Sequence, residues 1–173
     1  MTQAEPNTTS LFLEISRRKL VAEYWPRMRS CVESLTDEQV WWRPNEASNS
    51  VGNLLLHLNG NVGQWLLGAF NAREDARNRP TEFAAREVIP RAALLERLEA
   101  TLQEAAATLS LLTDADLLRT CDVQGYTVSG VEVVYHVVEH FGMHHGQILY
   151  ITKLVRGEDL GFYRALDKTG RLA

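Results

Sequence analysis

The sequence is poor in cysteine, in long apolar runs and in basic charge, and each shortage excludes a class of protein. Only Cys31 and Cys121 occur in 173 residues, too few for a disulfide framework or a cysteine-rich metal site. No apolar run approaches the ~20 residues of a membrane-spanning helix. The net charge of -4 argues against a nucleic-acid partner. The first ten residues are polar, so we expect no signal peptide or anchor and predict a cytoplasmic protein without a membrane partner.

Basic residues gather in two short runs, at 17–19 and at Arg73, Arg77 and Arg79. Acidic residues lie close to both runs in the sequence. We therefore interpret both as solvent-exposed faces rather than as phosphate-binding sites.

Four long segments have the apolar spacing of helices, and we see no convincing strand. The predicted helices cover about 10–35, 49–71, 90–112 and 127–156. Ser10 is a plausible N-cap for the first helix, and Pro26 should kink it. Pro90 suits the first position of the third helix, and Gly157 can cap the end of the fourth.

The connections add three expectations. Trp41 and Trp42 are predicted to plug one end of a bundle, and the charged connection 72–89 is long enough to be mobile or functional. The tail after Gly157 carries apolar residues that can fold back over the bundle. Because the fourth helix is apolar nearly all round, it should be buried on most sides. The sequence thus predicts one all-α domain over residues 1–173, an up-and-down four-helix bundle or a variant with a long connection.

The histidines are the least random feature of the sequence. There are five in the chain: His57 in the second predicted helix, and His136, His140, His144 and His145 in the fourth. Imidazole is the commonest transition-metal ligand, and residues four apart on a helix share a face. Two such histidines can bind one ion, with a third ligand from a facing helix.

A helical wheel at about 100° per residue ranks these histidines. Three charged residues mark the outer face of the fourth helix: Glu132, Glu139 and Lys153. His136 lies near that face, whereas His140 and His144 turn progressively inward. The wheel therefore favours His140 and His144 as the pair of ligands, and His145 cannot easily share their ion.

Other polar residues have supporting roles in this hypothesis. His57 lies on the polar flank of its helix beside Asn61, which fits a site lining a cleft and also fits plain solvent exposure. Gln147 lies between His136 and His140 on the wheel, so it can reach the metal or its bound water. We expect His136 to support the site from behind or to lie on the surface, and His145 to pack in the core.

Two alternatives remain open at this point. Residues 136–140 read H-x-x-E-H, the inverted zincin pattern, in which Glu139 is the general base of a metallopeptidase. The wheel argues against it, because Glu139 falls on the outer face. The other alternative has no metal, with the histidines packed or acting as a pH sensor.

Three stretches resemble the DinB-like superfamily of metal-binding helical bundles, which includes YfiT-like proteins. Residues 138–148, VEHFGMHHGQI, resemble the H-x-x-x-H-x-G-Q-I signature of the last bundle helix. Residues 54–58, LLLHL, with Gly60 and Asn61 following, resemble the histidine region of the second helix. The third stretch is WWRPN at 41–45.

The resemblance implies His57, His140 and His144 as ligands of one divalent transition metal: zinc, nickel or iron. It also implies a homodimer and a small-molecule substrate. Three histidines leave a coordination position open, which is typical of a catalytic ion. Such an ion can activate a water or a low-molecular-weight thiol, and the resemblance favours thiol transfer or isomerisation. The alternative is a non-catalytic metal-binding stress or interaction protein.

Overall fold

A π-helical turn interrupts the first long helix beside its proline. The computed structural model describes residues 7–164, and its first helix comprises α1 (Thr8–Arg18), η1 (Lys19–Tyr24) and α2 (Trp25–Glu33). At the end of η1, the N–H of Trp25 donates to the carbonyl of Leu20. Pro26 has no N–H, and its ring would crowd the carbonyl four residues earlier. The wider turn accommodates the proline, and the three segments form one continuous helix.

The N-cap of the first helix lies three residues earlier than predicted. Asn7 is the cap, and its Oδ1 accepts a hydrogen bond from the N–H of Ser10 at 2.8 Å. The Ser10 hydroxyl in turn accepts from the N–H of Asn7. Ser10 therefore completes a capping box inside the first turn, and its assignment as the N-cap was wrong.

The second helix has the same design as the first. It comprises α4 (Val51–Val62), η2 (Gly63–Leu67) and α5 (Gly68–Asn71). Ser50 caps it, because the Ser50 hydroxyl accepts from the N–H of Asn53 at 3.1 Å. The third helix, α7 (Arg91–Leu109), begins one residue after Pro90, and Asp37 accepts from the N–H of Arg91 at 2.9 Å. The fourth helix, α9 (Gly130–Arg156), ends at Gly157 with φ 69° as predicted.

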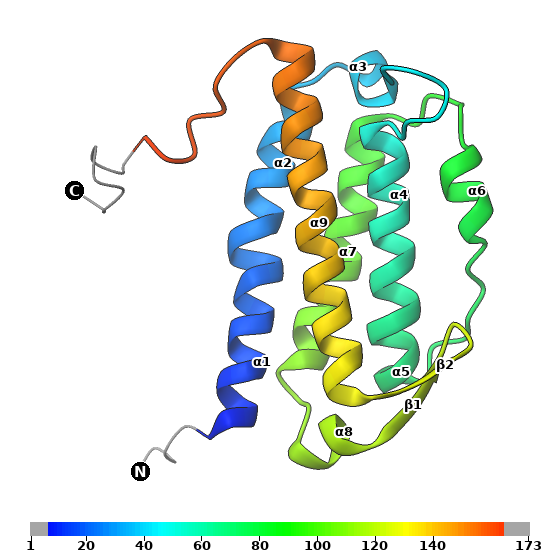
Figure 1. Cartoon of the computed structure of the whole chain (residues 1–173), viewed down its shortest axis with the longest axis vertical. Helices are drawn as coiled ribbons and strands as arrows, with labels where there is room; N and C mark the ends of the chain where they lie inside the picture. The colour runs from blue at the N-terminus through cyan, green and yellow to red at the C-terminus, as the bar shows by residue number, and fades with distance from the viewer. Residues whose placement is uncertain (1–6, 165–173) are drawn as a thin grey trace.

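The four long helices form the predicted bundle with one long connection (Figure 1). Helices α4 and α7 run in the same direction, so the chain between them returns along the whole length of the bundle. This return segment carries the short helix α6 (Arg79–Ala84), which packs on the outer side of α4. The all-α fold class is confirmed, and the charged connection 72–89, predicted as a loop, contains a helix.

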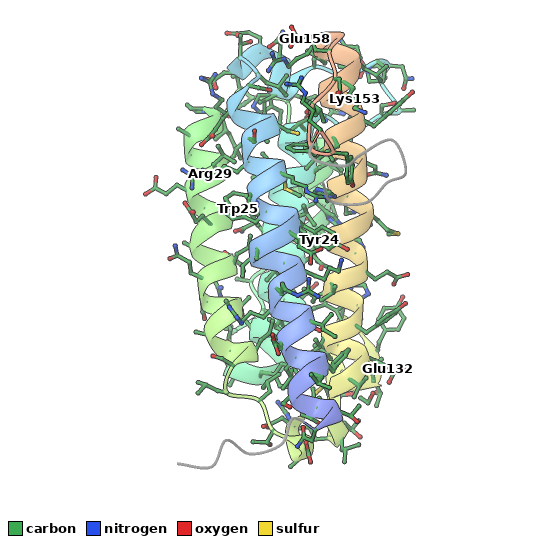
Figure 2. The ribbon with its side chains drawn as sticks, turned by 90° about the vertical axis from the view of Figure 1, so that its left-hand side faces the viewer. Tyr24, Trp25, Arg29, Glu132, Lys153 and Glu158 are labelled. Carbon is green, nitrogen blue, oxygen red and sulfur yellow. The ribbon has the colours of Figure 1, made fainter. Side chains whose placement is uncertain are left out.

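The first helix packs between α7 and α9 (Figure 2). Trp25 and Arg29 lie on its side toward α7, where the Arg29 guanidinium bonds Glu99 at 2.8 Å. Tyr24 lies toward α9, and its ring stacks on the fully buried ring of Phe141 with centroids 6.3 Å apart. The helix therefore buries a different face on each neighbour.

A β-hairpin precedes the last helix, which corrects the expectation of no strands. It consists of β1 (Thr120–Val123) and β2 (Tyr126–Ser129), paired antiparallel with Cys121 opposite Val128. Gln124 and Gly125 form the turn with φ of 54° and 83°, the left-handed pair that a tight two-residue hairpin turn needs. Because the hairpin takes up residues 126–129, α9 begins at Gly130 rather than at Thr127.

The two tryptophans of the first connection behave differently. Trp41 is the last residue of the short helix α3 (Asp37–Trp41), and Trp42 follows it. Trp41 packs against the core and donates from Nε1 to the carbonyl of Ile89 at 3.0 Å. Trp42 remains 40% exposed. Trp41 alone therefore closes this end of the bundle, and the prediction for Trp42 was wrong.

The tail folds back as predicted over its described part. Leu160 and Phe162 are partly buried against the core, and the Arg27 guanidinium lies 5.2 Å from the ring centre of Tyr163. The expectations for residues 1–6 and for the end of the tail, 165–173, lie outside the described residues. Within residues 7–164, no helix has the length and apolar character needed to cross a membrane.

The close contact between α8 (Asp114–Leu118) and α9 yields a stability prediction. An alanine Cβ at Gly130 would lie 2.1 Å from the Asp116 carbonyl oxygen and 2.9 Å from the Leu117 Cα. These are backbone atoms and cannot rotate away. We expect Gly130→Ala to lower the free energy of unfolding by about 1–3 kcal/mol in urea titrations.

Gly146 in the same helix is the matched control. A Cβ there meets no atom within 4 Å, so Gly146→Ala should raise the free energy of unfolding by about 0.5–1 kcal/mol. If both variants changed stability in the same direction, the contact between α8 and α9 would not be the cause.

Candidate metal centre

Three histidines from two helices converge in the bundle. His57 comes from α4, and His140 and His144 come from successive turns of α9. One ring nitrogen from each lies within 4.8 Å of the other two. The Nε2 atoms of His57 and His140 are 2.8 Å apart. We call these three residues the histidine cluster; the structure thus brings together the three residues named from the sequence.

Helical spacing and ring orientation explain the convergence. His140 and His144 are four residues apart, so their rings share a face of α9 with centroids 4.5 Å apart. Each ring centroid lies 5.0 Å from that of His57, in an edge-to-face arrangement. His57 is buried and the other two are half-buried. The cluster therefore lies at the edge of the core, where a small molecule can reach it.

Burial keeps the cluster in the form that binds metals. Burial, together with the neighbouring His144 and His57, lowers the pKa of His140 to about 3. Burial also lowers the pKa of His144, although a hydrogen bond with Gln147 opposes this effect. Neutral imidazole is the ligand form of histidine. These two rings are therefore ready to coordinate at neutral pH without first losing a proton.

Glu82, in the return segment, fixes the ring of His57 from behind. Its Oε2 lies 2.9 Å from His57 Nδ1. A ring that coordinates through Nε2 carries its proton on Nδ1, which then donates to Glu82. Asn53 holds the segment in place, because its Nδ2 donates to the carbonyl oxygens of Glu82 at 2.8 Å and Ala85 at 3.1 Å.

Arg77 keeps Glu82 ionised. Its guanidinium donates to both carboxylate oxygens, from Nε to Oε1 at 2.7 Å and from Nη2 to Oε2 at 2.8 Å. Burial disfavours the charged carboxylate, but the hydrogen bonds from Arg77 and His57 outweigh it and lower the pKa of Glu82. Only 6% of the Arg77 side chain is exposed, so its interpretation as part of a solvated face was wrong. That interpretation holds for Arg73, which is 51% exposed.

The sequence contains no motif that could have identified Glu82 and Arg77. They lie 25 and 20 residues after His57, on a segment whose path is set by the crossover and not by any local spacing. The one available signal was that this long connection is charged.

The three residues predicted to support the site divide into two groups. Gln147 touches the cluster: its Oε1 lies 2.7 Å from His144 Nδ1, which leaves Nε2 of that ring to face the other histidines. His136 also touches the cluster, because its ring stacks on that of His140 with centroids 5.2 Å apart, and Asn61 is linked to the cluster through His136. Asn61 and His136 bond each other, from Asn61 Nδ2 to His136 Nε2 at 3.2 Å, and the His136 ring stacks on Trp65 with centroids 3.8 Å apart.

Two further predictions for α9 concern His145 and Glu139. His145 is buried and packs on the ring of Tyr24 with centroids 4.9 Å apart, which confirms it as a core residue. Glu139 is exposed on the outer face of the helix. An H-x-x-E-H metallopeptidase would need this carboxylate beside the ion, and the structure does not place it there.

A cavity of about 540 Å³ opens onto the cluster. His57 and His140 form its inner end, and Trp65 and His136 form one wall. The hairpin supplies another wall through Tyr126, Val128 and Gln124, and Gln124 is held by a hydrogen bond from Trp65 Nε1 at 2.9 Å. The hairpin missed by the sequence analysis is therefore part of the site.

The four-helix bundle has a DinB-like fold, and the chain shares this fold with a solved DinB-like protein. More narrowly, the chain belongs to the family described as "Protein of unknown function (DUF1572)", which matches residues 7–165. No curated protein gives a significant match.

Solved structures agree on the fold. A conserved protein from Enterococcus faecalis is 18% identical, with a TM-score of 0.68 over 84% of this chain and 97% of its own. A DinB-like protein from Bacillus cereus is 15% identical, with a TM-score of 0.60 over 76% of this chain and 85% of its own. At these identities the similarity establishes the fold alone.

Proposed function

We propose that His57, His140 and His144 bind one divalent transition metal, and that this centre activates a low-molecular-weight thiol or a water for reaction with a small molecule. The observation that carries the proposal is the convergence of three ring nitrogens within 4.8 Å. Two imidazole Nε2 atoms 2.8 Å apart are favourable only if a proton or a cation lies between them.

The donor set fits such an ion. Neutral nitrogen ligands suit zinc, nickel or iron. Among residues 7–164, no fourth histidine, cysteine or carboxylate joins the group, so one coordination position stays available. When bound, the ion would supply Lewis acidity toward a thiol or a water held in that position.

The surrounding residues orient the ligands and the substrate. When His57 coordinates through Nε2, Glu82 can accept the proton on its Nδ1, and Arg77 holds Glu82 in its charged form. Gln147 fixes the ring of His144. Trp65 and Tyr126 provide an aromatic surface along the cavity against which a small molecule can pack.

Mass spectrometry of the untagged protein tests the proposal. We expect about one transition-metal ion per chain. After replacement by cobalt, addition of 2-mercaptoethanol should produce a thiolate charge-transfer band in the near-ultraviolet spectrum. No bound ion after reconstitution with zinc, nickel and iron would refute the proposal, and an ion that accepts neither thiol nor water would favour the non-catalytic alternative. The homodimer stays a prediction, which sedimentation equilibrium can check.

A further inference from the structure

The cavity beside the histidine cluster contains two arginines that differ in their partners. Arg77 is committed to Glu82 by two hydrogen bonds. Arg79 lines the same cavity, is exposed, and lies over the ring of Phe83 at 4.9 Å. Within residues 7–164, Arg79 makes no ion pair and no side-chain hydrogen bond. One guanidinium at the cavity is therefore available to a ligand.

Nothing acidic balances this guanidinium inside the cavity. The described residues that line it include no aspartate or glutamate. Glu82, whose carboxylate is bonded to Arg77, lines a separate cavity. The cavity therefore presents one cation to an incoming ligand, beside an uncharged aromatic wall.

The cavity also contains a buried polar atom that lacks a hydrogen-bond partner. Asn61 lines it with only 3% of the residue exposed, and its Oδ1 has no hydrogen-bond partner among the described residues. A buried amide oxygen without a partner is unfavourable. A ligand, or a water molecule that binds with the ligand, can donate a hydrogen bond to this oxygen.

We propose that Arg79 binds a carboxylate of the ligand, and that the thiol used by this centre is a small organic acid. Guanidinium groups pair with carboxylates through two parallel hydrogen bonds, which fix both position and orientation. The carboxylate binds at the mouth of the cavity, the body of the ligand packs on Trp65 and Tyr126, and the sulfur reaches the histidine cluster. The position of the sulfur at the histidine cluster rests on the proposed function, whereas the carboxylate subsite can be tested separately.

The test compares ω-mercapto acids of increasing chain length with their amides, by calorimetric titration of the metal-loaded protein. We expect the acid of the best length to bind about tenfold more tightly than its amide, the factor that 1.4 kcal/mol gives. In Arg79→Gln the acid should lose this advantage while the amide binds as before. Arg17→Gln removes the same charge from an exposed position on α1 and should keep the preference.

Acids and amides that bind alike to the wild-type protein, or a preference that survives in Arg79→Gln, would overturn the proposal. Butyrate and butyramide, titrated into protein treated with EDTA, test the carboxylate subsite in the absence of a metal ion. A preference for butyrate that disappears in Arg79→Gln supports the subsite even if the chain binds no metal. Equal binding of the two compounds counts against the subsite, whatever the metal content.

Discussion

Replacement of His140 by alanine is expected to abolish metal binding and to leave the bundle folded. The His140 Nε2 lies 2.8 Å from that of His57 and belongs to the only group of three convergent donors in residues 7–164. Two remaining imidazoles cannot enclose an ion, so we expect the metal content to fall from about one ion per chain to below about a tenth. The ring is half-buried, so its loss should cost little stability.

Met143→Ala is the matched control for this variant. Met143 is on the same helix, next to His144, and is 55% exposed. The Met143→Ala protein should retain the ion, and circular dichroism should show the same helicity in both variants. A folded His140→Ala protein that still holds a full equivalent of metal would place the ion elsewhere.

Replacement of Arg77 by leucine is expected to destabilise the protein by about 3–5 kcal/mol, the usual cost of removing one partner of a buried ion pair. The side chains of Arg77 and Glu82 are only 6% and 10% exposed. Without the guanidinium, the Glu82 carboxylate remains buried with His57 as its main hydrogen-bond donor. Urea unfolding at neutral pH measures the difference.

The pH dependence of this loss has a definite sign. In the wild-type protein the pKa of Glu82 is lowered from its ordinary value of 4.5. The ionised carboxylate therefore adds stability above that pH, and this stability is lost as the pH falls through the lowered pKa. The difference between wild type and Arg77→Leu should narrow in acid, and a difference independent of pH would contradict this account.

The double variant separates stability from metal affinity. Arg77→Leu combined with Glu82→Leu removes both charges, so we expect most of the lost stability to return. Metal affinity should nevertheless fall by about 10- to 100-fold, because His57 Nδ1 loses its acceptor. A double variant with wild-type affinity would show that the ion pair does not support the site.

The predicted convergence of the histidines depended on helical geometry. A spacing of four residues fits His136 with His140 as well as His140 with His144. The charged outer face of the helix, marked by Glu132, Glu139 and Lys153, was the feature that favoured the second pair.

The apolar character of α9 was misleading. Tyr135, Tyr150 and Leu154 of this helix are exposed, so the expectation that it is buried on most sides was wrong.

The features that the sequence did not reveal depend on long-range packing. Glu82 meets His57 only because the return segment crosses the outer side of α4, and no short-range pattern specifies that path. The hairpin was missed because its strands are four residues each, too short for a clear alternation. Arg77 has the composition of a surface residue and is buried by a partner that is itself unpredictable.

The π-helical turn η2 divides the second helix into two parts with separate roles. The part before it carries His57 and Asn61, whereas α5 after it carries Asn71, which bonds Thr108 of α7 at 2.9 Å. A π turn holds about one residue more than an α turn, so losing that residue would rotate the following part by about 100°. Insertions and deletions at residues 63–67 can therefore change how the far end of the helix packs while the histidine keeps its direction. In evolutionary terms, a change of helix length at this turn would leave the histidine cluster in place but would alter the cavity wall that Trp65 forms.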